Sequence, residues 1–137
     1  MENTITKGGM VKDSVHLNKE TIGEILLNDL KGIIYDWENV EYENELCELC
    51  NELIQLIDKG LISFGNDRET DKRLFHTIIP DMELKWLCNS FGVFQDKGDY
   101  WSDIHPNDIG IDSTVLEDLM IFYYDLSDVI MDKIQNN

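Results

Sequence analysis

The sequence predicts an α+β fold that is rich in helix, with about four helices and one or two short β-hairpins in the middle of the chain. Apolar residues recur at helical spacing over 19–35, 44–59 and 114–134. Between the second and third segments, short runs rich in Ile, Phe and Thr are flanked by turn residues, which is typical of strands. We expect residues 1–16, which are polar, to be a flexible N-terminus and residues 17–137 to form a single globular domain.

The first two helices are predicted from their apolar stripes and from the residues at their ends. Asn18 is a suitable N-cap for the first helix, and Gly60 suits the C′ position after the second. The first stripe consists of Ile22, Ile25, Leu26, Leu30, Ile33, Ile34 and Trp37. The second consists of Leu46, Leu49, Cys50, Leu53 and Ile57.

The middle of the chain is where strands are expected. Residues 61–64 and 73–79 are predicted to pair around the polar loop 65–72. A short helix then follows Asp81 and ends at Gly92. A turn over 96–99 is predicted to join 93–94 to 100–101 as a second hairpin.

The last helix is predicted to begin with a capping box and to carry acidic residues opposite its core stripe. Thr114 and Glu117 have the spacing of that box. The residues on the polar side are Glu117, Asp118, Asp125, Asp128 and Asp132, with Ile121, Tyr124 and Met131 on or beside them. Such a mixed surface is typical of an interface, or of packing on another element of the same fold.

The formal net charge of −17, from 28 acidic and 11 basic residues, limits the classes of partner. Nucleic-acid binders carry basic surfaces, and both phosphate and anionic membranes would be repelled. The charge lies in two blocks, since residues 36–58 hold eight acidic residues and no base, and residues 98–137 hold nine acidic residues and one base. These blocks favour a cation, a metal or a basic protein as partner.

The second helix carries its acidic residues on one face. Glu41, Glu45, Glu48 and Glu52 are separated by three or four residues, which places them together and away from the leucine stripe. Like charges at this spacing cost a few tenths of a kcal/mol per pair. The face is either a solvated surface kept for solubility or a docking surface for a basic partner.

The sequence offers little support for an enzyme, a metal site or a cofactor. No nucleotide-binding, nucleophile-elbow or zinc-protease motif is found, and His16, His76 and His105 are far apart. Cys47 and Cys50 match a C-x-x-C pattern within a helix, where core cysteines are the better interpretation. No signal peptide or membrane span is evident, so we expect a reduced, cytoplasmic protein.

In size, in charge, in the acidic block over 36–52 and in a predicted loop over 98–103, the chain resembles small acidic immunity proteins of bacterial polymorphic and contact-dependent toxin systems. The resemblance is at the level of this class and involves no signature motif. It implies a protein that neutralises a cognate toxin, commonly a nuclease, by covering its basic active site. It also implies a gene directly downstream of the toxin gene.

The predicted function is therefore a cytoplasmic inhibitor of a basic protein, without an enzymatic activity, a cofactor, or a nucleic-acid or membrane partner. Acidic residues would steer association, and aromatic residues would slow dissociation. The predicted binding residues are Glu41, Glu45, Glu48, Glu52, Trp37, Tyr42, Asp99, Tyr100, Trp101 and Asp103. Two alternatives are a nucleic-acid mimic that blocks a DNA- or RNA-binding protein, and a small enzyme with an unrecognised acidic site.

Overall fold

The computed structural model describes residues 19–36 and 42–137, and every regular element in these two ranges is a helix. The predicted α+β class is therefore wrong, because the described residues contain no strand. The helices are α1 (Lys19–Asp36), α2 (Glu43–Asp58), α3 (Arg68–Ile78), α4 (Leu84–Asp103), α5 (Pro106–Ile109) and α6 (Ser113–Gln135).

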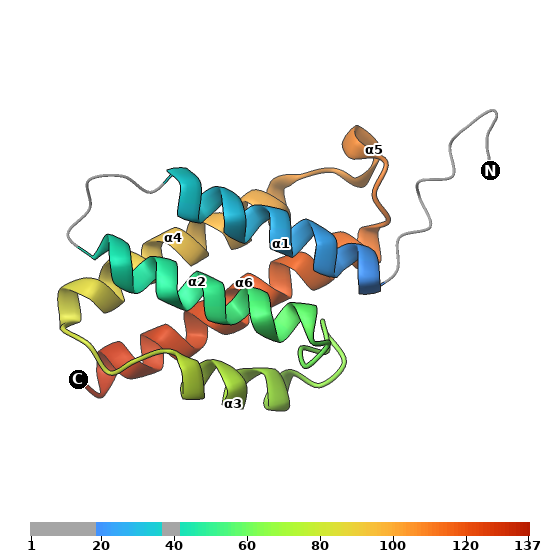
Figure 1. Cartoon of the computed structure of the whole chain (residues 1–137). Coiled ribbons are helices and arrows are strands. Elements are labelled where there is room, and N and C mark those ends of the chain that lie inside the picture. The colour runs from blue at the N-terminus through green and yellow to red at the C-terminus, as the bar shows by residue number, and fades with distance from the viewer. Residues whose placement is uncertain (1–18, 37–41) are drawn as a thin grey trace.

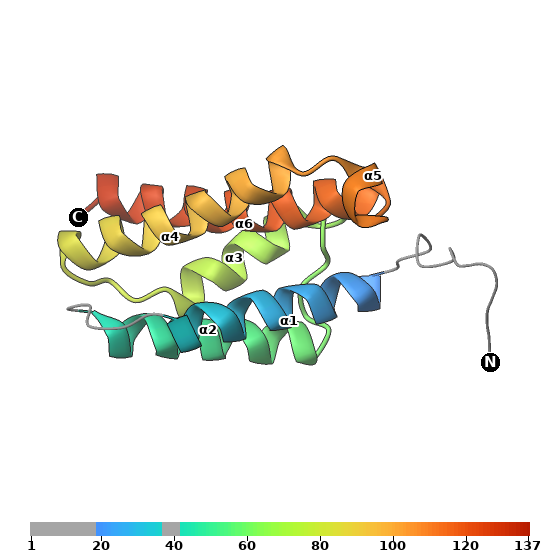
Figure 2. The same ribbon diagram turned by 90° about the horizontal axis from the view of Figure 1, so that it is seen from above.

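The long helices form two antiparallel pairs that pack on each other. Helices α1 and α2 make one layer, and α4 and α6 make the other (Figure 2). Helix α3 packs against α6 and lies along one side of the molecule, below α2 in Figure 1. Helix α2 therefore lies beside α3 at one edge of its layer, which leaves part of its surface outside the core.

The core between the layers is aromatic at its centre. Phe75 of α3 meets Phe122 of α6 edge-on at 5.5 Å between ring centroids, and Phe122 meets Tyr123 in the same way at 5.0 Å. Phe94 of α4 stacks on Tyr123 at 6.3 Å. Burying large aromatic side chains dominates core energetics, so this cluster holds α3, α4 and α6 together.

The first predicted hairpin is instead an irregular segment followed by α3. Asp67, in the predicted loop, is the N-cap of this helix, and its carboxylate accepts hydrogen bonds from the backbone N–H and the hydroxyl of Thr70. Only Phe75 and Asp71 of α3 are buried. The helix therefore has a short apolar stripe, and its Phe, Thr and Ile residues made 73–79 resemble a strand.

The second predicted hairpin is wrong as well, because 93–101 lies inside the continuous helix α4. Gly92 does not end a helix, and Gly98 does not form a turn. A Cβ atom at Gly98 would lie 2.6 Å from Cε1 of Tyr124, so this glycine allows α4 and α6 to approach closely. Because glycine is typical of helix ends and turns, Gly92 and Gly98 made this helix of 20 residues difficult to predict from the sequence.

The three helices predicted over 19–35, 44–59 and 114–134 are confirmed as α1, α2 and α6. Gly60 ends α2 as expected, with a φ of +71°. The backbone N–H of Gly60 donates to the carbonyl of Ile57, and that of Leu61 donates to Leu56, as in a Schellman motif. At α6 the N-cap is Asp112 rather than Thr114, since its carboxylate accepts from the Thr114 N–H at 2.8 Å.

No helix within residues 19–36 and 42–137 combines the length and apolar character that crossing a membrane requires.

Candidate functional site

The acidic face predicted on α2 is present on the outside of this helix. Leu46, Leu49, Cys50, Leu53 and Ile57 are buried, whereas Glu48 and Glu52 are exposed and Glu45 is half-buried. The spacing that places the leucines inward places these three glutamates together on the other side. Glu41 and Trp37, which were predicted to act with them, lie outside the described residues.

The three glutamates line one wall of a surface groove. The groove has a volume of about 450 Å³, and Ile78 and Pro80, at the end of α3, form part of its opposite wall. Leu49 and Asn51 of α2 also line it. A groove with carboxylates on one side and apolar atoms on the other can accept a basic side chain together with its aliphatic stem.

Glu45, Glu48 and Glu52 form no ion pair with a basic side chain of residues 19–36 or 42–137. This acidic face, defined by these three residues, is therefore uncompensated within the described structure. Its neighbouring glutamates repel each other, at a cost of a few tenths of a kcal/mol per pair.

The acidic residues of α6 differ, because α3 supplies them with bases. Arg68 makes a bidentate contact with Asp125, with distances of 2.9 Å from Nε and 2.5 Å from the terminal nitrogen. Lys72 lies 3.7 Å from Asp128, and Nε2 of His76 lies 3.5 Å from Asp132. Three of the nine acidic residues of the second block therefore lie beside bases of α3.

Of the three acidic residues of α6 that lie beside bases of α3, Asp125 is the buried one, with a side chain that is 2 % exposed. A hydrogen bond from Arg68 to Asp125 raises the pKa of the guanidinium, so Arg68 remains charged. The sequence did contain a signal for it, because Arg68, Lys72 and His76 are spaced four residues apart, which puts them on one face of a helix. The strand predicted over 73–79 obscures this helical spacing.

Two predicted aromatic anchors are buried and hold the fold together instead. Tyr42 is 5 % exposed, and its hydroxyl donates to Glu83 at 3.3 Å. Trp101 is 7 % exposed, and its Nε1 donates to Asp29 of α1 at 2.9 Å. The expectation that these two side chains are available to a partner is therefore corrected.

The remaining predicted residues lie on α4, in the other layer from the acidic face (Figure 2). Tyr100 is exposed, with Nζ of Lys97 at 5.3 Å from its ring centroid. Asp99 is exposed and accepts a hydrogen bond from the Tyr124 hydroxyl at 2.6 Å, and Asp103 is exposed. The structure does not bring these three residues together with Glu45, Glu48 and Glu52, and 98–103 is helical rather than a loop.

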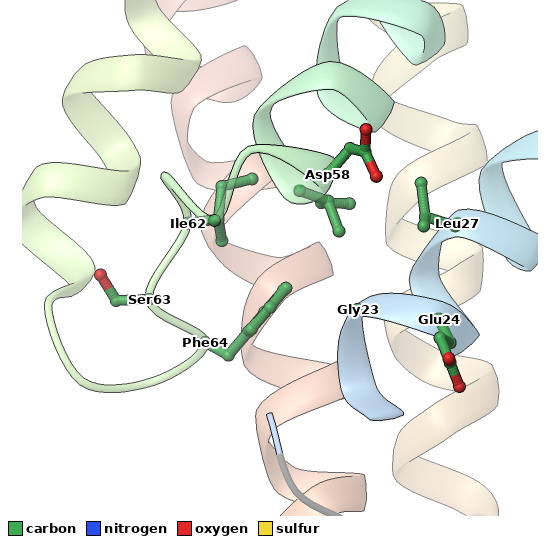
Figure 3. Close-up of a pocket in the computed structure, with 9 residues that line it drawn as sticks. Gly23, Glu24, Leu27, Asp58, Ile62, Ser63 and Phe64 are labelled. Carbon is green, nitrogen blue, oxygen red and sulfur yellow. The ribbon is translucent and has the colours of Figure 1, made fainter. Parts of the chain in front are cut away.

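A second hollow, which sequence reasoning missed, lies where the beginning of α1 meets the end of α2 (Figure 3). It has a volume of about 510 Å³. Its walls are apolar, from Leu27, Ile57, Ile62 and Phe64, and Glu24 and Asp58 also line it. Only the tertiary packing of three segments creates this pocket, so no local sequence pattern could have indicated it.

Among the described residues, Cys50 belongs to the core and His105 caps a helix. Burial, together with the neighbouring Cys47, raises the pKa of the Cys50 thiol to about 12, so Cys50 remains a protonated core residue. His105 caps α5, since its Nδ1 accepts from the Asn107 N–H at 3.2 Å. In the part of the chain that the structure describes, no three His, Cys, Asp or Glu side chains are grouped as metal ligands.

Comparisons of the chain with protein-family models, with curated proteins and with solved structures gave no match.

Proposed function

We propose that this protein binds and neutralises a basic protein through the acidic face of α2. The observation that carries the proposal is that Glu45, Glu48 and Glu52 line a groove and have no basic partner among the described residues. An uncompensated acidic surface raises the association rate with a basic protein by electrostatic steering.

A nuclease toxin is the partner class that we favour. A nuclease must hold phosphates, so its active-site cleft is positively charged and offers the complement of the acidic face. The resemblance to immunity proteins supports the same class. Binding over the cleft would exclude the nucleic-acid substrate without any chemical step by the inhibitor.

The nucleic-acid mimic receives less support from the distribution of charge. A mimic requires carboxylates that follow a duplex-like path over several elements. Asp125, Asp128 and Asp132 of α6 instead lie beside Arg68, Lys72 and His76 of α3, so these carboxylates are not free to form such a path.

The proposal is tested by co-expressing the chain with the protein encoded directly upstream and measuring cell growth. Wild type should protect the cells, and the triple variant Glu45→Lys, Glu48→Lys, Glu52→Lys should not. A control with the same change in charge replaces three exposed acids elsewhere, Glu69→Lys, Asp96→Lys and Glu117→Lys, and should still protect. Equal protection by both triple variants would contradict the proposal, as would a wild-type chain that gives none.

A further inference from the structure

The hollow between α1, α2 and residues 61–64 is a pocket whose shape is fixed before anything binds. Phe64, which forms one wall of the pocket, has an unusual backbone conformation, with a φ of +47°. The Ser63 N–H donates to the buried Asp71 carboxylate at 3.0 Å, and the Phe64 ring lies 6.4 Å from that of Phe122. A non-glycine residue in the left-handed region costs free energy and persists only where its surroundings impose it.

Gly65 adds to this constraint, with a φ of +91°. A Cβ atom at this position would lie 2.4 Å from Oδ1 of Asp118, so the backbone runs directly against that carboxylate. The Schellman motif at Gly60 and Leu61 fixes the other end of the segment. Residues 61–65 are thus fixed at both ends and at Ser63 in the middle. A wall that is ordered before binding reduces the entropy lost when a ligand binds.

The chemistry of the walls specifies an occupant. Leu27, Ile57, Ile62 and Phe64 offer apolar surface, and Phe64 extends from the loop toward Gly23 of α1 (Figure 3). Glu24 and Asp58 are exposed and come from two different helices. Neither forms an ion pair with a basic residue that the structure describes. The occupant should therefore have an aliphatic stem and a cationic end.

We infer that this pocket receives an arginine side chain of the basic partner, as an anchor separate from the acidic face of α2. A planar guanidinium can contact carboxylates on two elements, and it also stacks on aromatic rings such as Phe64. Its methylene stem would cover the apolar walls. The identity of the partner rests on the proposed function, whereas the preference of the pocket for an alkyl guanidinium does not.

The inference is tested with n-butylguanidinium as a probe, observed through the backbone amide NMR signals of Gly23, Gly60 and Ser63. We expect saturable shifts with half-saturation at roughly millimolar concentration, as suits one small fragment. n-Butylammonium should bind more weakly. The neutral n-pentanol and the anionic pentanoate should give no saturable shift in the same range.

Two variants show whether the response comes from this pocket. Asp58→Lys should weaken probe binding by roughly fivefold or more, because it replaces one attractive charge by a repulsive one. The fold should tolerate it, since a cation is favourable at the C-terminus of a helix. The matched control Asp96→Lys, on exposed α4 surface, should leave probe binding unchanged.

Gly23→Leu provides an independent block, because a Cβ atom at Gly23 would lie 3.4 Å from Cγ2 of Ile57 and a longer side chain would enter the hollow. Equal binding of n-pentanol, unchanged binding to Asp58→Lys, or no response to n-butylguanidinium would each overturn the inference. These outcomes are independent of the protection assay, so a failure of the proposed function is distinguishable from a failure of the pocket.

Discussion

Asp29 of α1 links the two layers through hydrogen bonds. Its Oδ2 accepts from Nε1 of Trp101 at 2.9 Å and from the Tyr123 hydroxyl at 3.2 Å, and Lys97 lies 3.7 Å from its Oδ1. Burial, with the charge of Asp29, raises the pKa of Tyr123 well above its ordinary value, so this tyrosine remains a donor. One side chain of α1 therefore links α1 to both α4 and α6.

Two substitutions of Asp29 distinguish the contribution of its hydrogen bonds to stability from the contribution of its charge. Asp29→Ala leaves two buried donors without their acceptor and should lower the free energy of unfolding by at least about 2 kcal/mol. Asp29→Asn keeps an acceptor oxygen and loses the negative charge with its half-buried pairing to Lys97, so it should cost clearly less. Urea unfolding at pH 7 measures both. Equal losses in the two variants would show that the hydrogen bonds are not what links the layers.

Asp71 gives the fold a predictable response to pH. Burial raises the pKa of its carboxyl above the ordinary value, and Asp125 adds to this effect, although the hydrogen bond from Ser63 opposes it. The folded chain therefore holds this proton more tightly than the unfolded chain does. Ionisation of Asp71 costs stability as pH rises through the raised pKa, and that cost is absent below about pH 4, where both states are protonated.

Asp71→Asn should accordingly raise the melting temperature at pH 7, because the amide oxygen still accepts from Ser63 and carries no buried charge. The gain should shrink as pH falls toward 4. Thermal melts of wild type and variant between pH 4 and 8 test this. A gain that is constant over this range, or one that grows toward acid pH, would contradict the assigned cause.

At the scale of the elements, α2 keeps an arrangement of charge that its own stability does not favour. Glu48 lies between Glu45 and Glu52 at helical spacings of three and four residues. Glu48→Lys removes two repulsive pairs and creates two attractive ones, which should raise the free energy of unfolding by about 0.5–1 kcal/mol.

The same substitution places a cation in the acidic groove and should weaken partner binding. Urea unfolding and titration with the partner, both made with Asp96→Lys as the control, test the two effects together. A variant that is more stable and binds less tightly is expected. A more stable variant with unchanged affinity would favour the alternative interpretation, a solvated face kept for solubility.

The helices that sequence reasoning predicted are those whose apolar stripe is long. Helices α1, α2 and α6 bury residues at every turn, which produces a clear period of 3.6 residues. Helix α3 was missed because Asp71 occupies one of its two buried positions. Helix α4 was missed because Gly98 serves close packing on Tyr124, a contact that exists only in the tertiary structure.

Part of the candidate site could also be predicted from the sequence, and part could not. Glu45, Glu48 and Glu52 could be predicted, because the face opposite a buried stripe must be exposed. The apolar wall of the groove, at Ile78 and Pro80, depends on where α3 ends relative to α2 and has no local signal. Tyr42 and Trp101 were assigned to the surface because they lie among acidic residues, whereas their hydrogen bonds to Glu83 and Asp29 satisfy them within the fold.

For the molecule as a whole, the 28 acidic residues fall into two parts, since some pair with bases inside the fold and others do not. Helix α3 supplies bases to the acids of α6, whereas the acidic face of α2 has no basic partner among the described residues. The two parts predict different responses to salt. Exposed charges are screened over about 10 Å at 0.1 M ionic strength, whereas the partly buried pair of Arg68 with Asp125 is screened less.

The most direct measurement is therefore the association rate constant with the proposed basic partner, determined by stopped-flow mixing over a range of ionic strength. The wild-type rate should fall steeply with added salt. The triple variant Glu45→Lys, Glu48→Lys, Glu52→Lys should associate at least about tenfold more slowly at low salt and lose most of this dependence. The control triple variant should retain both. Equal rates and equal salt dependence for wild type and the α2 triple variant would contradict the claim that the acidic face of α2 guides the partner.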